Sequence, residues 1–166
     1  IPTKAARICY AAEGDGIMEF GLRRAQGPDA GIYGARAAVI GGCAGTSNVL
    51  TGQMFDVPVM GTHAHSWIMS FDDEYTAFYT YAKLYPMACT LLVDTYDTLN
   101  SGVPNAIKVF KQIKKEGIEL KNYGIRLDSG DLAYLSKKAR KMLDDAGFKD
   151  ATITASNDLD EFLIAS

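Results

Sequence analysis

Residues 57–67 have the sequence Val-Pro-Val-Met-Gly-Thr-His-Ala-His-Ser-Trp, in which an apolar segment is followed by small polar residues and by both histidines of the chain. The apolar residues 57–60 predict a short buried strand that ends at Gly61, and a helical pattern begins near Trp67. In α/β proteins ligands bind at such turns, because a helix N-terminus offers unpaired N–H groups next to the end of a strand. A structural role for a histidine on this turn remains an alternative to catalysis.

Composition and charge are those of an ordinary globular protein. The chain has 166 residues, of which 48% are hydrophobic and 22% charged, enough for one domain with a substantial core. The net charge of −3 argues against broad binding of nucleic acid or anionic membranes, and no apolar run has the length of a membrane span. Cys9, Cys43 and Cys89 suit neither a disulfide framework nor a zinc site, and favour a reducing, cytoplasmic compartment. Because the sequence begins at Ile1 within a helical pattern, we expect it to be part of a longer chain.

A regular alternation of strand and helix patterns runs through the second half of the chain. Apolar segments alternate with amphipathic helical segments at a spacing of roughly 30 residues, the length of a βα unit. The strands expected there are residues 90–93, 123–127 and 151–155, and the helices are residues 104–116 and 132–146. Crossover helices make consecutive strands parallel. Earlier in the chain we expect a strand at residues 17–20 and helices at residues 2–12, 28–40 and 66–85.

Polar or charged side chains follow each of the five predicted strands. In order along the chain, they are Arg23 and Arg24, Thr62 and His65, Asp94 and Asp97, Arg126, Asp128 and Asp131, and Asn157 and Asp158. The carboxyl ends of parallel strands lie on one face, which in (βα) barrels is the active-site face. Helix capping explains one acid at a strand end but not two. The pattern therefore predicts a site for an anionic substrate or for metal-assisted chemistry, with arginines for phosphate or carboxylate, acids for Mg²⁺ or positive charge, and histidine for proton or group transfer.

Two other features allow a structural interpretation beside a functional one. The Gly-Gly-Cys-Ala-Gly run at residues 41–45 precedes no βα unit, so it predicts a turn and close packing rather than a dinucleotide loop. The following residues 46–48 predict the N-cap of a short helix. The pair Arg23 and Arg24 forms either a solvated basic corner or a bidentate clamp for carboxylate or phosphate.

Five motifs resemble those of the nicotinate phosphoribosyltransferase family. They are Glu-Phe-Gly-Leu-Arg-Arg at 19–24, Gly-Thr-His-Ala-His-Ser at 61–66, Leu-Leu-Val-Asp-Thr-Tyr-Asp at 91–97, Arg-Leu-Asp-Ser-Gly-Asp-Leu at 126–132 and Ser-Asn-Asp-Leu-Asp-Glu at 156–161. Each motif alone is weak, but five in this order are specific. The resemblance implies a type II phosphoribosyltransferase fold, an irregular α/β barrel with a separate α+β domain. Residues 1–166 would then be one partial (βα) barrel domain of parallel strands, the central part of that fold, without the separate domain and the remaining barrel strands.

The resemblance also implies a reaction. Nicotinate and phosphoribosyl pyrophosphate give nicotinate mononucleotide and pyrophosphate, with coupled ATP hydrolysis through a phosphohistidine, in NAD salvage. This is glycosyltransferase and ligase chemistry, for which we expect Mg²⁺ as cofactor and ATP as co-substrate. The family implies a cytoplasmic homodimer with active sites shared between subunits, and we expect neither a nucleic-acid nor a membrane partner.

Family roles carry over to the matching positions. The phosphorylated histidine corresponds to His65, and we expect Asp128 and Asp131 to stabilise the ribosyl cation. In the family the residues matching Thr62 and Arg126 contact the nicotinate side of the site. The further substrate-binding candidates are Arg23, Arg24, Ser66, Asn157 and Asp158, and the metal candidates are Asp94 and Asp97.

Three alternatives remain open on the sequence. The first is a relative with the same fold that uses nicotinamide, or more remotely quinolinate, in place of nicotinate. The second is a non-catalytic barrel that binds a phosphorylated metabolite, in which the same arginines and acids serve binding and His65 is a hydrogen-bond donor. The third is a fragment that acts only in interaction or dimerisation.

Overall fold

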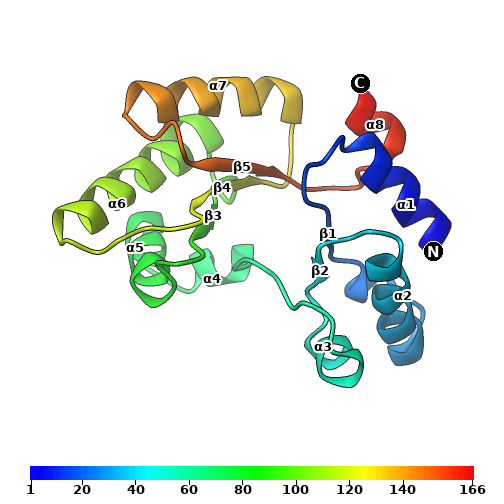
Figure 1. Cartoon of the computed structure of the whole chain (residues 1–166). Coiled ribbons are helices and arrows are strands. Elements are labelled where there is room, and N and C mark those ends of the chain that lie inside the picture. Colours follow the sequence, from blue (N-terminus) through cyan, green and yellow to red (C-terminus); the bar gives the residue numbers. More distant parts are fainter. The chain divides into compact units, whose positions relative to one another are not determined.

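The computed structural model describes all residues from 1 to 166 and shows an α/β fold with parallel strands (Figure 1). The chain divides into two compact units. The first, here called the terminal unit, contains residues 1–61 and 158–166, and the second, the central unit, contains residues 62–157. The single partial-barrel domain expected over residues 1–166 stays a prediction.

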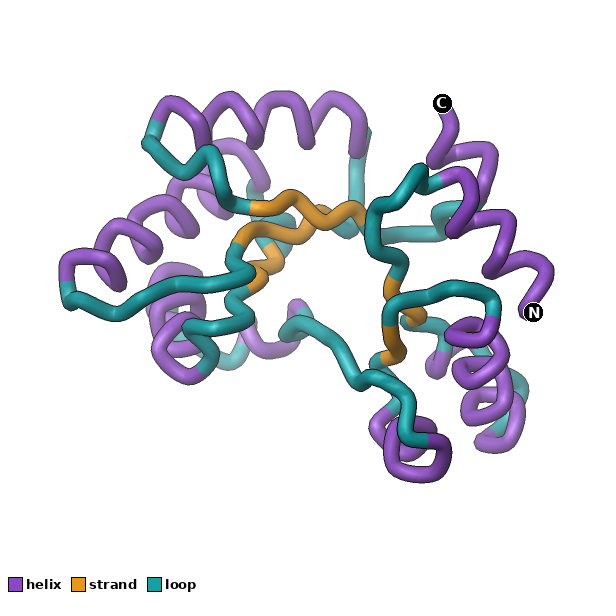
Figure 2. The backbone as a smooth tube through the Cα atoms, viewed as in Figure 1, coloured by secondary structure: helices purple, strands orange, loops and turns teal.

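A three-stranded parallel sheet forms the middle of the central unit, and its strands appear in orange in Figure 2. The strands are β3 (Thr90–Leu92), β4 (Gly124–Leu127) and β5 (Thr152–Ala155), in the order β3-β4-β5. The helices α6 (Val103–Lys115) and α7 (Leu132–Asp145) connect them. The predicted βα rhythm and the parallel pairing are therefore confirmed, because each crossover helix returns the chain to the same edge of the sheet.

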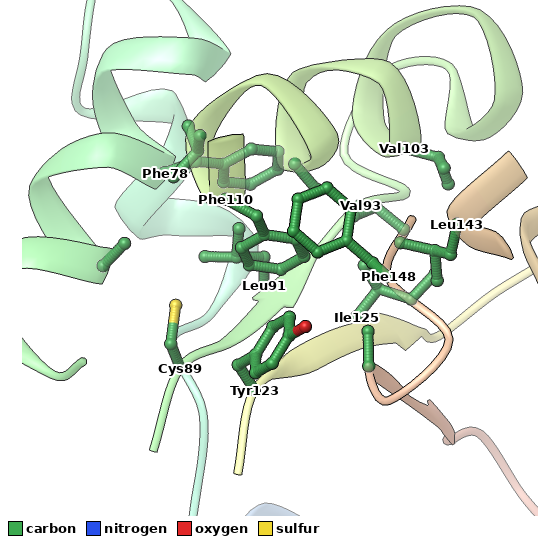
Figure 3. Close-up of a cluster of buried hydrophobic side chains, with 14 of the residues drawn as sticks. Phe78, Cys89, Leu91, Val93, Val103, Phe110, Tyr123, Ile125, Leu143 and Phe148 are labelled. Carbon is green, nitrogen blue, oxygen red and sulfur yellow. The ribbon is translucent and has the colours of Figure 1, made fainter. Parts of the chain in front are cut away.

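The core of the central unit lies between this sheet and its helices. Figure 3 shows Phe78, Phe110, Leu91 and Ile125 in one cluster of hydrophobic side chains, and all four are fully buried. Phe78 belongs to α5 (Glu74–Leu84), which follows the short helix α4 (His65–Met69). Each such side chain contributes on the order of 1.5–3 kcal/mol through removal of apolar surface from water. This packing fixes the strands, and so also the loops that leave their carboxyl ends.

The helix expected over residues 66–85 is two helices, because the chain turns between α4 and α5. The Asp73 side chain caps the N-terminus of α5, since its Oδ1 accepts a hydrogen bond of 2.8 Å from the Thr76 N–H. A π-helical turn, η2 (Thr98–Gly102), precedes α6 and was not predicted. Gly102 lies so close to the sheet that a Cβ atom there would be 1.8 Å from the Val93 carbonyl oxygen. Close approach of backbone to backbone therefore determines this turn.

The terminal unit is built mainly from short helices. Its helical elements are α1 (Pro2–Ala11), η1 (Leu22–Arg24), α2 (Pro28–Ile40), α3 (Val49–Phe55) and α8 (Glu161–Ala165). Two short parallel strands, β1 (Met18–Glu19) and β2 (Gly45–Thr46), pair with each other. Glu161 links α8 to α1 through ion pairs with Lys4 and Arg7. No helix in either unit is long and apolar enough to cross a membrane.

The prediction of a buried strand at residues 57–60 is wrong. Val59 and Met60 are 50% and 40% exposed, and the segment pairs only through a single bridge between Val59 and Thr46. Pro58 has no N–H to donate, and the partner strand β2 has only two residues, so a ladder cannot extend. Strand β2 lies where the sequence predicted a turn. Glycine is needed at position 45, because a Cβ there would lie 2.7 Å from the Pro58 carbonyl oxygen.

Candidate active site

Polar side chains converge at the carboxyl ends of β3, β4 and β5. Asp94 and Thr95 follow β3, Asp128 and Ser129 follow β4, and Ser156 follows β5. Thr62 and His65 join them from the turn that leads into α4. We call these residues, together with Arg126 at the end of β4, the strand-end cluster. The structure thus brings together, within the central unit, side chains from four separate segments of the sequence.

Arg126 holds three of these segments together. Its side chain is 13% exposed, and its three nitrogens donate to Ser156 Oγ (2.8 Å), Thr62 Oγ1 (2.9 Å) and Asp128 Oδ1 (2.8 Å). Burial alone would raise the pKa of Asp128, but the hydrogen bond from Ser156 and the positive charge of Arg126 lower it below its ordinary value. Asp128 therefore stays ionised beside a fixed guanidinium, which also fixes the Thr62 hydroxyl.

Asp94 has a buried carboxylate in which one oxygen accepts hydrogen bonds and the other accepts none. Its side chain is 1% exposed, and Oδ2 accepts hydrogen bonds from the Asp128 N–H (2.9 Å) and the Ser129 hydroxyl (2.6 Å). Oδ1 is buried without a hydrogen-bond partner and lies 3.9 Å from His65 Nε2. A buried polar atom without a partner is costly, so this oxygen is suited to a positive or proton-bearing group that enters the cluster.

The His65 side chain is more exposed than the charged side chains of the cluster. Its side chain is 37% exposed, whereas those of Arg126, Asp94 and Asp128 are 13%, 1% and 20% exposed. Nδ1 lies 3.1 Å from Thr95 Oγ1, and Nε2 lies 3.6 Å from Asp128 Oδ2. An accessible imidazole next to two carboxylates can carry a proton or act as a nucleophile.

The second histidine, His63, has a structural role. It is buried, its Nε2 accepts a hydrogen bond of 3.2 Å from the Leu92 N–H, and its ring lies edge-on to Tyr81 at 4.7 Å between centroids. Burial lowers the pKa of His63 from 6.5 to about 4. The functional role assigned to His65 from the family resemblance stays a prediction.

The lowered pKa of His63 predicts a pH-dependent stability. The unfolded chain binds a proton to this residue near pH 6.5, while the folded chain resists protonation down to about pH 4. The free energy of unfolding should therefore fall as pH decreases through that window, by up to about 3 kcal/mol from this group. NMR titration should show a neutral His63 ring at about pH 5. In His63→Gln, which keeps an acceptor for the Leu92 N–H, urea unfolding should show a shallower loss of stability between about pH 7 and about pH 5. An identical slope in both proteins would contradict this account of His63.

Two predicted acids act as helix caps. Asp131 Oδ1 accepts a hydrogen bond of 2.9 Å from the Tyr134 N–H at the start of α7, and Asp97 accepts from the Leu99 and Asn100 N–H groups at the start of η2. Both carboxylates are exposed, and capping accounts for their positions. The structure shows no contact between either side chain and the strand-end cluster, so a catalytic role for Asp131 and a metal role for Asp97 stay predictions.

The remaining candidates belong to the terminal unit or lie near the two ends of the central unit. Arg23 and Arg24 form η1 in the terminal unit, where Arg24 Nη2 lies 3.7 Å from Asp158 Oδ1. Both side chains of that pair are largely exposed, so the pair contributes little to stability. Ser66 follows His65 on α4 and is exposed, and Asn157 is the last residue of the central unit. Their contact with a ligand stays a prediction.

Three of the four hydroxyl groups of the cluster were not among the candidates from the sequence. Ser129 donates to Asp94, Ser156 donates to Asp128, and Thr95 Oγ1 lies 3.1 Å from His65 Nδ1. Each lies directly beside a predicted strand end, and two of them are neighbours of Asp94 and Asp128 in the chain. A search for hydroxyls next to the strand-end acids would have found them, since buried carboxylates and imidazoles need such partners.

No group of three or more His, Cys, Asp or Glu side chains in the chain has the arrangement of a metal site. Mg²⁺, however, is commonly held by one or two carboxylates together with substrate phosphates. The unpartnered Oδ1 of Asp94 and the neighbouring Asp128 carboxylate fit that pattern better than the predicted pair of Asp94 and Asp97.

Comparisons with known proteins agree with the family resemblance of the motifs. The nicotinate phosphoribosyltransferase (NAPRTase) family model matches residues 16–158. Nicotinate phosphoribosyltransferase from Bacillus subtilis is 58% identical over 164 residues, which are 99% of this chain and 33% of the relative. A nicotinate phosphoribosyltransferase from Mycobacterium tuberculosis is 46% identical over 166 residues, 100% of this chain and 35% of the relative.

A solved structure gives the same result. The crystal structure of human nicotinic acid phosphoribosyltransferase matches with a TM-score of 0.87 and 32% identity, over 99% of this chain and 43% of that chain. This chain spans about a third of the length of the curated relatives it matches. Because the family model covers all the strands of the described fold and the strand-end cluster, the chain belongs to the nicotinate phosphoribosyltransferase family.

Proposed function

We propose that the full-length protein is a nicotinate phosphoribosyltransferase that forms nicotinate mononucleotide and pyrophosphate from nicotinate and phosphoribosyl pyrophosphate, with coupled ATP hydrolysis, in NAD salvage. One observation carries the proposal beyond family membership. Arg126, the carboxylates of Asp94 and Asp128, and an accessible His65 meet at the carboxyl ends of the parallel strands. This is the edge of a parallel sheet at which α/β enzymes bind substrates.

The cluster suits the charge changes of the reaction. The bond from the ribose anomeric carbon to the pyrophosphate oxygen breaks, positive charge develops on the sugar, and the pyridine nitrogen of nicotinate forms the new bond. Asp128, held ionised by Arg126 and Ser156, stabilises the developing cation. Thr62 and Arg126 bind the nicotinate side of the site, since a fixed guanidinium and hydroxyl recognise a carboxylate.

Mg²⁺ would be held by Asp94 and Asp128 together with substrate phosphates, and it would neutralise charge on the departing pyrophosphate. The Asp128 N–H and the Ser129 hydroxyl both donate to Oδ2 of Asp94, so Oδ1 remains available to the metal ion. The additional substrate-binding and catalytic candidates remain Arg23, Arg24, Ser66, Asp131, Asn157 and Asp158, and Asp97 remains a metal candidate.

His65 would couple ATP to this chemistry as a phosphohistidine. An imidazole that is 37% exposed and flanked by carboxylates is accessible to a γ-phosphate, and its phosphorylation changes charge next to the substrate site. In His65→Asn we expect nucleotide formation to become insensitive to ATP, because the asparagine amide cannot accept the phosphoryl group. An ATP stimulation equal to that of the wild type would contradict this role.

The complete fold that we propose is a partial barrel over residues 1–166 that the rest of a longer chain closes, with a separate α+β domain. We further propose a cytoplasmic homodimer with shared active sites. The three parallel strands of the central unit and the two of the terminal unit support the barrel, since parallel strands with crossover helices are its building units. Sedimentation of the full-length protein tests the dimer.

The substrate assignment is tested with the full-length protein and labelled nicotinate, nicotinamide and quinolinate, each with phosphoribosyl pyrophosphate, Mg²⁺ and ATP. We expect release of pyrophosphate and formation of labelled mononucleotide with nicotinate, and much slower reaction with the other two. A preference for nicotinamide would reassign the substrate. Binding of phosphoribosyl pyrophosphate without any turnover would favour the alternative of a non-catalytic protein that binds a phosphorylated metabolite.

A further inference from the structure

We infer that Cys9 and Cys43 form an oxidation site, at which hydrogen peroxide converts a pair of thiols to a reversible disulfide. Both residues belong to the terminal unit, Cys9 on α1 and Cys43 in the loop between α2 and β2. In a reducing compartment the pair rests as thiols and forms the bridge only on exposure to an oxidant. The inference goes beyond the proposed function and does not rest on it, because neither thiol belongs to the strand-end cluster.

The two thiols meet because α1 packs on the loop that follows α2. Cys43 is buried with Ala5 of α1 and Ala38 of α2, and Cys9 packs against the same group. Gly42 brings the loop close to α1: its φ is +112°, and a Cβ there would lie 3.4 Å from both Cβ and Sγ of Cys9. Cys9 therefore touches the residue that precedes Cys43, and the two thiols interact with each other. The two cysteines are far apart in the sequence, which is why the sequence did not predict the pair.

The difference in exposure between the two thiols decides the order in which they react. Cys9 is partly exposed, whereas Cys43 is only 8% exposed. Burial, the neighbouring Cys9 thiol and the charge of Glu19 raise the pKa of Cys43 to about 12, so little of its thiolate is present at neutral pH. Because the thiolate is the reactive form and peroxide arrives from solvent, Cys9 is oxidised first and Cys43 is the resolving thiol.

The oxidation takes place in two balanced steps. The Cys9 thiolate attacks one oxygen of hydrogen peroxide, the O–O bond breaks, and the products are a sulfenic acid and, after protonation of the leaving hydroxide, water. The Cys43 sulfur then attacks the Cys9 sulfur, the S–O bond breaks, and hydroxide leaves with the proton of Cys43 as a second water. Once Cys9 is a sulfenic acid, its negative charge no longer opposes ionisation of Cys43. Two thiols thus lose two electrons to one peroxide, and the bridge ties α1 to the loop that leads into β2.

The third cysteine, Cys89, provides the matched control. It is fully buried in the core of the central unit, and burial raises the pKa of its thiol to about 12. A buried thiol in apolar surroundings is inert toward an oxidant in solvent, so Cys89 should remain reduced. Cys89→Ala therefore removes a thiol from the chain without touching the pair.

The test uses the reduced full-length protein exposed to hydrogen peroxide. The remaining thiols are alkylated after unfolding, and the digest is analysed by mass spectrometry without reduction. We expect two peptides joined through Cys9 and Cys43, with the loss of two hydrogen atoms, and we expect dithiothreitol to separate them. Cys89→Ala should give the same joined peptides. Cys9→Ala should give none and should leave Cys43 as an alkylated thiol.

Cys43→Ala tests the order of the two steps. Without the resolving thiol, Cys9 should remain as a sulfenic acid, so a cyclic 1,3-diketone that reacts with sulfenic acids should label Cys9 more strongly than in the wild type. Should Cys43→Ala fold poorly by thermal unfolding, the digests of wild type and Cys9→Ala provide the decision. Three results in the wild type overturn the inference: Cys9 joined to a second copy of the chain, Cys9 oxidised beside a free Cys43 thiol, or both thiols unchanged.

Discussion

Replacing Arg126 by lysine is expected to lower kcat/KM for nicotinate mononucleotide formation by about 10²–10³-fold. The guanidinium donates at the same time to Ser156, Thr62 and Asp128, at 2.8–2.9 Å. A lysine ammonium is a point charge on a flexible stem and cannot hold three fixed directions. The Thr62 hydroxyl would then keep only its hydrogen bond to the His63 carbonyl oxygen, and Asp128 would lose its hydrogen bond from the guanidinium, which helps to keep its pKa low.

Arg140 provides the matched control for this substitution. It lies on α7, donates to the Ala151 and Phe148 carbonyl oxygens and pairs with Asp144, so it joins a helix to the loop before β5. Arg140→Lys should lower the thermal stability and leave kcat/KM within about twofold of the wild type, since surface and structural contacts do not enter the transition state. Equal losses of kcat/KM in the two variants would show that Arg126 acts only through stability.

Replacing Gly102 by alanine is expected to lower the free energy of unfolding by about 3 kcal/mol or more. The added Cβ would lie 1.8 Å from the Val93 carbonyl oxygen and 2.6 Å from its carbonyl carbon. These are backbone atoms at the end of a core strand, and the core around Val93 is fully buried, so neither side can move without unpacking. Urea unfolding of the full-length variant gives the size of the loss.

Gly16→Ala is the control for Gly102→Ala. A Cβ at Gly16 would meet no atom within 4 Å, so this change should alter the free energy of unfolding by less than about 0.5 kcal/mol. A Gly102→Ala protein as stable as Gly16→Ala would mean that η2 does not approach the sheet as closely as described.

The part of the fold that the sequence predicted is the part governed by local patterns. Helix α2 begins at Pro28 and ends at Ile40, as the proline and the following glycines indicated. The central strands were found because apolar runs recur at the spacing of βα units. Element β2 and turn η2 were not found, because both depend on backbone approaching backbone at Gly45 and Gly102. Sequence patterns do not record such long-range contacts.

The candidate site was predictable to a similar extent. Parallel strands bring their carboxyl ends to one face, which is why Asp94, Arg126 and Asp128 could be assigned to one place from the sequence. Thr62 and His65 were assigned to the same place although the strand expected before them is not formed, and they reach it through the segment that leads into α4. Asp131 shows the limit of that rule, because an acid after a strand also serves as the N-cap of the next helix. Only the geometry distinguishes a capping carboxylate from one that faces a ligand.

The most direct measurement for the central claim is a crystal structure of the full-length protein with nicotinate mononucleotide bound. We predict that the pyridine carboxylate contacts Arg126 and Thr62, and that the ribose lies next to Asp128, at the carboxyl ends of β3, β4 and β5. A nucleotide bound elsewhere, with Arg126 still engaged by Ser156 and Thr62 and no ligand atom near His65, would contradict the assignment of the strand-end cluster as the active site.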